Sequence, residues 1–395
     1  MTGGGASGDE RRPIRARPLI AHIIFRLDYG GLENGVVNIV NGLPEEAFRH
    51  AVIALEGVRD FRQRIRRADV EVFSLHKRPG KDPGAYLRLY RLLKRLRPAL
   101  AHTRNLGTLE GAVVARLAGV PHRVHSEHGW DQDDPHGTNR KYHFLRRLAS
   151  PVIDRFVAVS QEIERWLSDT VGIRREKITR ICNGVDTRRF HPPTDAAERA
   201  LLADRFPPGS IVVGSVTRFN AIKDPLNLVR AFITARRDPA GGRLRLVMAG
   251  DGRLRAPAEQ LLRDAGEESA AWLPGSRDDI PQLLRAIDVF VLGSLREGIS
   301  NTVLEAMASG LPVVASATGG NLELIQDKVT GRLVEPGASD ELAAALLEYA
   351  RDDAVRVAQG RAARARVERE YSLQRMLADY EALYRSFCGD CPERV

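Results

Sequence analysis

Short apolar runs alternate with amphipathic helical segments along this chain, and the whole alternation occurs twice. The apolar runs cover residues 20–25, 50–54, 70–73, 99–103, 123–126 and 155–159 and, after a break, 211–216, 243–249, 271–273, 289–292 and 312–315. Segments such as 32–43, 86–96 and 161–167 have the periodicity of helices. Strands that alternate with helices build a parallel sheet covered on both faces. The sequence therefore predicts an α/β protein with two doubly wound, Rossmann-like parallel sheets.

A turn and a proline-rich connector separate the two halves. Asn183-Gly184-Val185-Asp186 is a turn sequence, and His191-Pro192-Pro193 follows it. Ligands of open parallel sheets bind beyond the carboxyl ends of the strands, so two facing sheets place a site in the cleft between them. We expect a flexible tail at 1–17, a first domain at 18–190, a second domain at 191–371, and at 372–395 a C-terminal helix, which could pack on the first domain, and a tail.

Positive charge is concentrated in the first half of the chain, which has 395 residues and a net charge of +9. Residues 1–190 carry 34 Lys and Arg against 22 Asp and Glu, whereas the remainder carries 26 against 29. Two interpretations are open: a polyanionic or membrane-surface partner, which such a field attracts, or a well-solvated Arg-rich surface. The basic amphipathic segment 86–97 presents the same choice, because it could lie on an anionic membrane or pack its leucines onto the sheet.

The lengths of the apolar runs and the number of cysteines indicate where in the cell the protein is found. No apolar run approaches the roughly 18 residues that cross a bilayer, so we expect no membrane span. The three cysteines give no disulfide framework, and we expect a chain without a leader in a reducing cytoplasm. Cys388 and Cys391 form a C-x-x-C pair to which the sequence assigns no role.

The segment 296–315 carries the strongest chemical signal. It leaves a buried strand, makes a glycine turn after Glu297 and enters a helix, with Glu305 about one turn inside it. The two acids could hold hydroxyl-bearing rings on either side of a diphosphate, as in a sugar nucleotide. Alternatively, Glu297 only stabilises the helix dipole and Glu305 is a solvated surface acid. The start of a helix also offers N–H groups to a phosphate; here they belong to Gly298, Ile299, Ser300, Asn301 and Thr302.

Glu297 and Glu305, followed by Met307-Ala308-Ser309-Gly310-Leu311-Pro312, resemble the signature of the group 1 retaining glycosyltransferases. The resemblance covers residues 20–383. Within the family, the chain looks most like the sugar transferases that accompany exosortase (PEP-CTERM) and exopolysaccharide loci, through the matching stretches 26–35, 103–105 and 125–130. It implies the GT-B fold, in which two Rossmann-like domains face each other across a cleft.

The resemblance also implies a role for several charged residues. Glu297 is implied to bind hydroxyls of the donor sugar, and Glu305 the ribose of the nucleotide. Arg218 and Lys223, after the first strand of the second domain, would clamp the diphosphate. Fixed cations there fit the chemistry, because a leaving nucleoside diphosphate gains charge as the glycosidic bond breaks. For either cation alone, a surface ion pair is the alternative.

Three residues of the first domain are further candidates. Gly30 and Gly31 lie between the first strand and a helix, where glycines allow backbone to approach a ligand closely. The resemblance implies that this loop contacts donor phosphate or shapes the acceptor pocket; a bare turn is the alternative. His128 matches a position implied to touch the donor sugar, the alternative being a polar loop histidine.

These observations lead to one functional hypothesis. The chain is expected to be a retaining, metal-independent hexosyltransferase without a cofactor, whose donor is a UDP-, GDP- or other nucleotide sugar. Its acceptor would be a lipid-linked saccharide, and the reaction would belong to the synthesis of exopolysaccharide or another cell-surface glycan. We expect a cytoplasmic protein, with peripheral contact to the inner face of an anionic membrane as a further option, and no nucleic-acid partner. The alternatives are a sugar-nucleotide epimerase on the same fold and a non-enzymatic nucleic-acid-binding protein.

Overall fold

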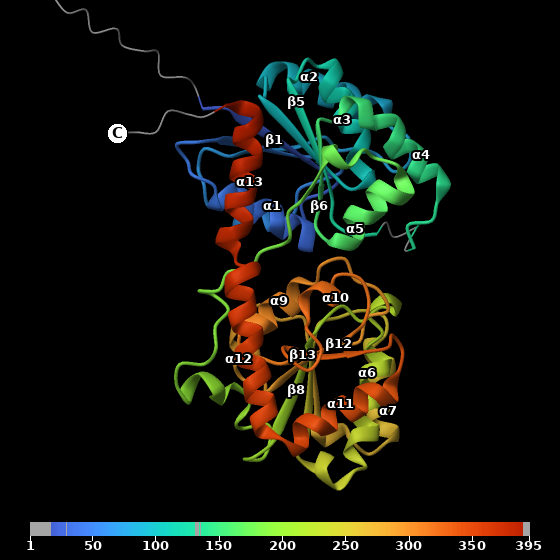
Figure 1. Cartoon of the computed structure of the whole chain (residues 1–395), viewed down its shortest axis with the longest axis vertical. Coiled ribbons are helices and arrows are strands. Elements are labelled where there is room, and N and C mark those ends of the chain that lie inside the picture. Colours follow the sequence, from blue (N-terminus) through green and yellow to red (C-terminus); the bar gives the residue numbers. More distant parts are fainter. Residues whose placement is uncertain (1–16, 29, 131–133, 135, 390–395) are drawn as a thin grey trace, which may run out of the picture.

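The computed structural model describes residues 17–28, 30–130, 134 and 136–389. The described residues form two lobes, each built on one parallel sheet, with one lobe above the other in Figure 1. The expected tail at 1–17 lies outside the described residues apart from Arg17. In the part of the chain that the structure describes, no helix is long and apolar enough to cross a membrane.

The first lobe has seven described strands in the order β3-β2-β1-β4-β5-β6-β7. They are β1 (Leu19–Ile24), β2 (Arg49–Ala54), β3 (Glu71–Ser74), β4 (Leu100–Arg104), β5 (His122–Glu127), β6 (Arg155–Ala158) and β7 (Ile178–Arg180). The helices between them are α1 (Gly31–Gly42), α2 (Pro83–Leu96), α3 (Leu109–Leu117), α4 (Arg140–Ala149) and α5 (Gln161–Arg165). Every residue of β1 is buried, and apart from His22 this strand is apolar.

The second lobe repeats this plan with six described strands in the order β10-β9-β8-β11-β12-β13. They are β8 (Ile211–Val216), β9 (Leu244–Ala249), β10 (Ala271–Gly275), β11 (Val289–Leu292), β12 (Val313–Ser316) and β13 (Gly331–Val334). Its helices are α6 (Pro225–Arg236), α7 (Arg255–Asp264), α8 (Ile280–Arg285), α9 (Asn301–Ala308), α10 (Asn321–Leu324), α11 (Ser339–Arg351) and α12 (Asp353–Glu370). The prediction of two doubly wound parallel sheets is confirmed.

Two edge strands, β7 and β13, are absent from the sequence prediction. Each has only three or four residues, and most of their side chains are incompletely buried. An edge strand is covered on fewer sides than a central strand, so its sequence need not be apolar. Periodicity therefore gives little signal at these positions.

The last described helix, α13 (Leu373–Cys388), returns to the first lobe. Figure 1 shows α12 along the second lobe and α13 along the first. Met376, Tyr380, Leu383 and Tyr384 of α13 pack in a core cluster with residues of β1, β4, β5 and β6. The two crossings between the lobes are bonded to each other, because the N–H of Val185 donates to the Tyr371 carbonyl (2.9 Å) and the N–H of Leu373 donates to the Val185 carbonyl (2.8 Å).

The basic helix α2 packs onto the first sheet. Its buried residues are Ala85, Leu89, Leu92 and Leu93, and Leu96 packs against the same cluster. Of the two interpretations of this segment, the one in which the leucines face the sheet is therefore the observed one. The arginines and the lysine of α2 lie on its outer side.

Candidate functional site

The strand order in each sheet reverses at one place, and the candidate residues follow the strands at these two places. In the second lobe the reversal lies between β8 and β11, which pair side by side. Lys223 follows β8 and Glu297 follows β11. In the first lobe the reversal lies between β1, which Gly30 and Gly31 follow, and β4. Ligands of such sheets bind at these points.

A buried ion pair joins the two loops of the second lobe. The Lys223 ammonium contacts Oε1 of Glu297, and the Ser294 hydroxyl donates to the same oxygen (2.6 Å). The N–H of Leu295 donates to the Ile222 carbonyl (2.8 Å), so the backbones of the two loops are also tied together. Glu297 is only 8% exposed. Among the described residues Oε2 of Glu297 has no partner, which leaves it available to a ligand hydroxyl.

The loop after β12 holds the Glu297 turn in place. The N–H of Gly320 donates to the Gly298 carbonyl (2.7 Å). A Cβ on Gly319 would lie 1.9 Å from the Glu297 carbonyl oxygen, and one on Gly320 would lie 2.0 Å from that of Gly298. The close backbone approach therefore requires two consecutive glycines here. These contacts fix the backbone of the turn that carries the Glu297 side chain.

Two side chains at the start of α9 make contacts within the protein and are not available to a ligand. Ser300 is the N-cap of α9, and its hydroxyl accepts from the Val303 N–H (3.4 Å). Ile299 is buried in the core. The side chains of these two residues are thus structural, and only their backbone N–H groups could meet a donor. Thr302 lies beside Ser300, with 3.2 Å between their hydroxyl oxygens.

Asn301 connects the lobes. Its side-chain oxygen accepts from the Asn183 amide (3.0 Å), and a Cβ on Gly31 would lie 3.0 Å from its Nδ2. The glycine loop after β1 therefore approaches the start of α9 directly. Of the two predicted glycines, Gly31 makes this close approach, whereas a Cβ on Gly30 would lie 2.2 Å from Oε2 of Glu33 in α1.

His128 lies across the cleft from the Glu297 turn. A Cβ on Gly298 would lie 2.9 Å from the His128 carbonyl oxygen and 3.2 Å from the Gly129 Cα. The His128 N–H donates to Oδ1 of Asn105 (2.8 Å), whose φ of +54° and ψ of 171° are unusual for a residue other than glycine. Burial and the nearby Arg104 lower the pKa of His128 to about 3, so the ring is neutral. Its buried Nε2 has no partner among the described residues.

A cavity of about 490 Å³ opens between the lobes on the side of Glu305. Gly30, Gly31 and Asn301 line it together with Glu305 and several arginines. Burial raises the pKa of Glu305 to about 7, although Arg189 and Arg64 act in the opposite direction. Sequence reasoning missed both arginines, because Arg64, at the end of the short 3-10 helix Asp60–Arg64, and Arg189, in a turn, each lie in an Arg-rich stretch without a motif. Four arginines and four acids line this cavity: Arg64, Arg66, Arg189, Arg277, Asp60, Asp186, Asp278 and Glu305. Such a polar lining fits a ligand that carries both anionic and hydroxyl groups.

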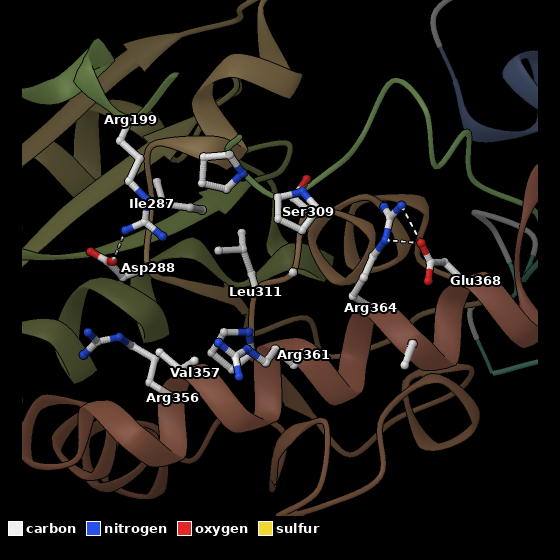
Figure 2. A pocket seen from close by; sticks show the side chains of 15 residues that line it. Arg199, Ile287, Asp288, Ser309, Leu311, Arg356, Val357, Arg361, Arg364 and Glu368 are labelled. Carbon is white, nitrogen blue, oxygen red and sulfur yellow. Dashed lines mark hydrogen bonds and ion pairs between the residues drawn. The ribbon is translucent and has the colours of Figure 1, made fainter. Parts of the chain in front are cut away.

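A second cavity, of about 440 Å³, lies at the opposite end of the second sheet (Figure 2). It is lined by α12, by the prolines of the connector and by residues that precede β11 and β12. Two of its arginines are paired within the cavity, Arg199 with Asp288 and Arg364 with Glu368. None of the predicted site residues lines it.

The predicted residues thus fall into three groups. Lys223, Glu297 and the His128 loop meet at the cleft, and Glu305 lines the interlobe cavity with the glycines and Asn301. Arg218 lies in the loop after β8 but is exposed, and it forms no ion pair with the described residues. The described residues contain no group of three or more His, Cys, Asp or Glu side chains that could hold a metal ion.

Two family models match the two lobes. The model described as Glycosyltransferase Family 4 matches residues 29–189, and the model described as Glycosyl transferases group 1 matches residues 210–352. The UDP-Gal:alpha-D-GlcNAc-diphosphoundecaprenol alpha-1,3-galactosyltransferase of Escherichia coli is 32% identical over 287 residues, which cover 70% of this chain and 73% of that protein. The lipopolysaccharide core biosynthesis mannosyltransferase LpcC of Rhizobium leguminosarum bv. viciae is 35% identical over 219 residues, 54% of this chain and 60% of that protein.

Solved structures share the fold over nearly the whole chain. Anabaena HepE in complex with UDP matches with a TM-score of 0.78 and 22% identity, covering 93% of this chain and 99% of that chain. A glycosyltransferase from Rickettsia africae matches with a TM-score of 0.80 and 19% identity, covering 95% of this chain and 99% of that chain. The fold is GT-B, as the resemblance implied. By its family models and its relatives, this chain belongs to the group 1 glycosyltransferases.

Proposed function

We propose that this glycosyltransferase moves a hexosyl group from a nucleoside-diphosphate sugar to a hydroxyl of a lipid-linked saccharide, with retention at the anomeric carbon. The observation that carries the proposal is the buried Lys223–Glu297 pair at the strand reversal of the second lobe, whose turn lies against the backbone of His128 across the cleft. A cation, a carboxylate and a neutral histidine around one cleft suit a substrate that joins a sugar to a diphosphate.

The donor would span the two parts of the site. Glu305 and the arginines of the interlobe cavity would receive the nucleoside, with the ribose hydroxyls on the carboxylate. Lys223, Arg218 and the N–H groups at the start of α9 would hold the diphosphate. The free carboxylate oxygen of Glu297 and Nε2 of His128 would contact sugar hydroxyls, which fixes the sugar between the lobes.

The reaction we propose is a front-side displacement. The bond from the anomeric carbon to the diphosphate oxygen breaks, and the acceptor oxygen forms its bond on the same face of the sugar. The acceptor proton passes to the departing diphosphate oxygen, so no protein base is needed. Negative charge grows on the diphosphate as it leaves, and fixed cations stabilise this charge more in the transition state than in the ground state. We propose that these cations replace a metal ion in this role.

The names of relatives support the acceptor class. The E. coli relative acts on an acceptor linked to diphosphoundecaprenol, and LpcC is named for lipopolysaccharide core synthesis. The HepE structures contain UDP, and one contains UDP-glucose. On this support we propose that the chain acts in the assembly of exopolysaccharide or another cell-surface glycan, at the cytoplasmic side.

The test has two stages. Thermal-shift measurements with a panel of nucleoside diphosphates identify the base, because a ligand that binds only the folded state raises its melting temperature. The matching sugar nucleotides are then incubated with short lipid-linked saccharides, and NMR of the product gives the anomeric configuration. Transfer with retention supports the proposal. An inverted product refutes the retention mechanism, and conversion of the donor sugar without an acceptor identifies an epimerase instead.

A further inference from the structure

The second cavity, which none of the predicted site residues lines, has the size and the lining of a small-molecule site. Its volume of about 440 Å³ lies within the range of about 300–1,000 Å³ that ligand pockets occupy. Its lining combines apolar side chains, among them Leu311, Pro192 and Pro193, with four arginines and two acids. Figure 2 shows α12 on one side of this cavity, opposite Arg199 and Asp288. The lining is therefore part apolar and part charged, with an excess of positive charge.

Two of the four arginines are available to a ligand. Arg361 is exposed and forms no hydrogen bond or ion pair with the described residues. Arg199 lies 3.8 Å from Asp288, which is longer than a hydrogen bond, and Asp288 accepts from the Val212 N–H (2.9 Å) with its other oxygen. The other two arginines of the lining are held by acids of α12 at 2.8 and 2.7 Å. One free and one weakly paired guanidinium group complement a dianion such as a phosphate.

One of the paired arginines, Arg364, joins this cavity to the first crossing between the lobes. Its guanidinium donates to the carbonyl oxygens of Thr187 (3.2 Å) and Phe190 (2.7 Å) in that crossing, and to the carbonyl oxygen of Ala308 at the end of α9. The same helix carries Glu305, which lines the interlobe cavity. A ligand that orders the second cavity would therefore act on the crossing and on the helix of the interlobe cavity together.

We propose that the second cavity binds a small organic phosphate and that this ligand restrains the first crossing between the lobes. The phosphate would contact Arg361 and Arg199, while a ring or short apolar body would cover Leu311 and the prolines of the connector. Binding stands on the cavity and its charge alone. Its effect on catalysis rests on the proposed function: closure of the lobes on a donor requires the crossing to flex, so the bound ligand should lower kcat.

Calorimetry with phenyl phosphate tests the site, because this molecule joins a ring to a dianion. The full chain is compared with Arg361→Gln, which removes the free charge, and with Ala365→Trp, which fills the cavity and keeps every charge of its lining. We expect about tenfold weaker binding in Arg361→Gln, as the loss of one charge-assisted hydrogen bond implies, and a similar loss in Ala365→Trp. The matched control is Arg369→Gln, because Arg369 is an exposed arginine of the same helix outside the cavity. This control should bind as the unaltered chain does, and phenol should not bind.

Hydrogen exchange locates the bound molecule. Phenyl phosphate should protect the amides of residues 308–311 and 357–365 in the unaltered chain and in Arg369→Gln, and this protection should be lost in Arg361→Gln. Equal binding by the unaltered chain and all three variants would overturn the proposal, and so would equal binding of phenol and phenyl phosphate. Protection confined to the loops of Lys223 and Glu297 would show that the molecule binds only in the donor cleft, which also overturns it.

Activity separates this inference from the proposed function. Phenyl phosphate should lower kcat in the unaltered chain and leave kcat unchanged in Arg361→Gln. Inhibition that competes with the donor and persists in Arg361→Gln would refute an effect through the second cavity. Binding and hydrogen exchange remain measurable even where no glycosyl transfer is found.

Discussion

Replacing Lys223 by methionine removes one charge from a buried pair and keeps the length of the side chain. The Glu297 side chain is 7% exposed and that of Lys223 is 18% exposed. Removing one partner of a buried pair costs about 3–5 kcal/mol of stability, because the other charge stays desolvated. Glu297 keeps the hydroxyl of Ser294, so we expect a cost near the lower end, about 3 kcal/mol. The melting temperature should fall.

The same substitution should lower turnover for a second reason. Lys223 is proposed to stabilise the departing diphosphate, and loss of one such group lowers kcat by about 10²–10³. A structural role and a catalytic role can be separated in the double variant Lys223→Met/Glu297→Gln, because it removes both charges while the glutamine can still accept from Ser294. Stability should largely return in the double variant, and turnover should not.

The assay is initial-rate transfer with saturating acceptor, alongside melting temperatures of each variant. The matched control is Arg236→Met, since Arg236 and Glu267 form a pair at 2.9 Å with each side chain 18% exposed in the same lobe. This control should lose stability and keep kcat. Turnover close to that of the unaltered chain in Lys223→Met, or turnover that recovers with stability in the double variant, would refute the role of Lys223.

Three further results are expected. Glu305 has a pKa of about 7, and ribose hydroxyls that donate to its carboxylate favour the ionised form. Nucleotide affinity measured by calorimetry should therefore rise from pH 6 to pH 8, and this rise should vanish in Glu305→Gln. The same pH profile in Glu305→Gln as in the unaltered chain would contradict the ribose contact. Asn105→Ala leaves the partly buried N–H of His128 without its acceptor and should cost about 1 kcal/mol and reduce kcat/KM, whereas Asn105→Asp keeps the acceptor. Equal kinetics for the two variants would argue against a positioning role. Activity should survive EDTA, and its restoration by added Mg²⁺ would refute a metal-independent reaction.

The sheets could be predicted from the sequence because their central strands are buried on both faces. Val289–Leu292 is apolar throughout, and Leu19–Ile24 is apolar apart from His22, and such runs need no knowledge of their neighbours. The meeting of Lys223 with Glu297 is different, since 74 residues separate them. Only the pairing of β8 with β11 brings their loops together, and strand order is a property of the tertiary fold.

Contacts between residues on opposite sides of the cleft are even harder to predict from the sequence than the pairing of Lys223 with Glu297. Arg64 and Arg189 come from two segments that meet only when the connector is folded, and neither has a motif around it. Asn301 was expected to meet the donor through a helix start, and the structure shows that its side chain also bonds Asn183. Local patterns report local structure, whereas these contacts depend on how the lobes are placed.

The return of α13 to the first lobe has a consequence for synthesis of the protein. Tyr380, Leu383 and Tyr384 complete a core that also contains Ile20 and Leu100. On the ribosome, the second lobe is therefore synthesised in full before the first lobe can finish folding. Until α13 is made, the face of the first sheet that it covers stays partly exposed. A premature stop near residue 371 would release a chain with this apolar surface open, and such a fragment should be a substrate for chaperones and proteases rather than a free-standing domain.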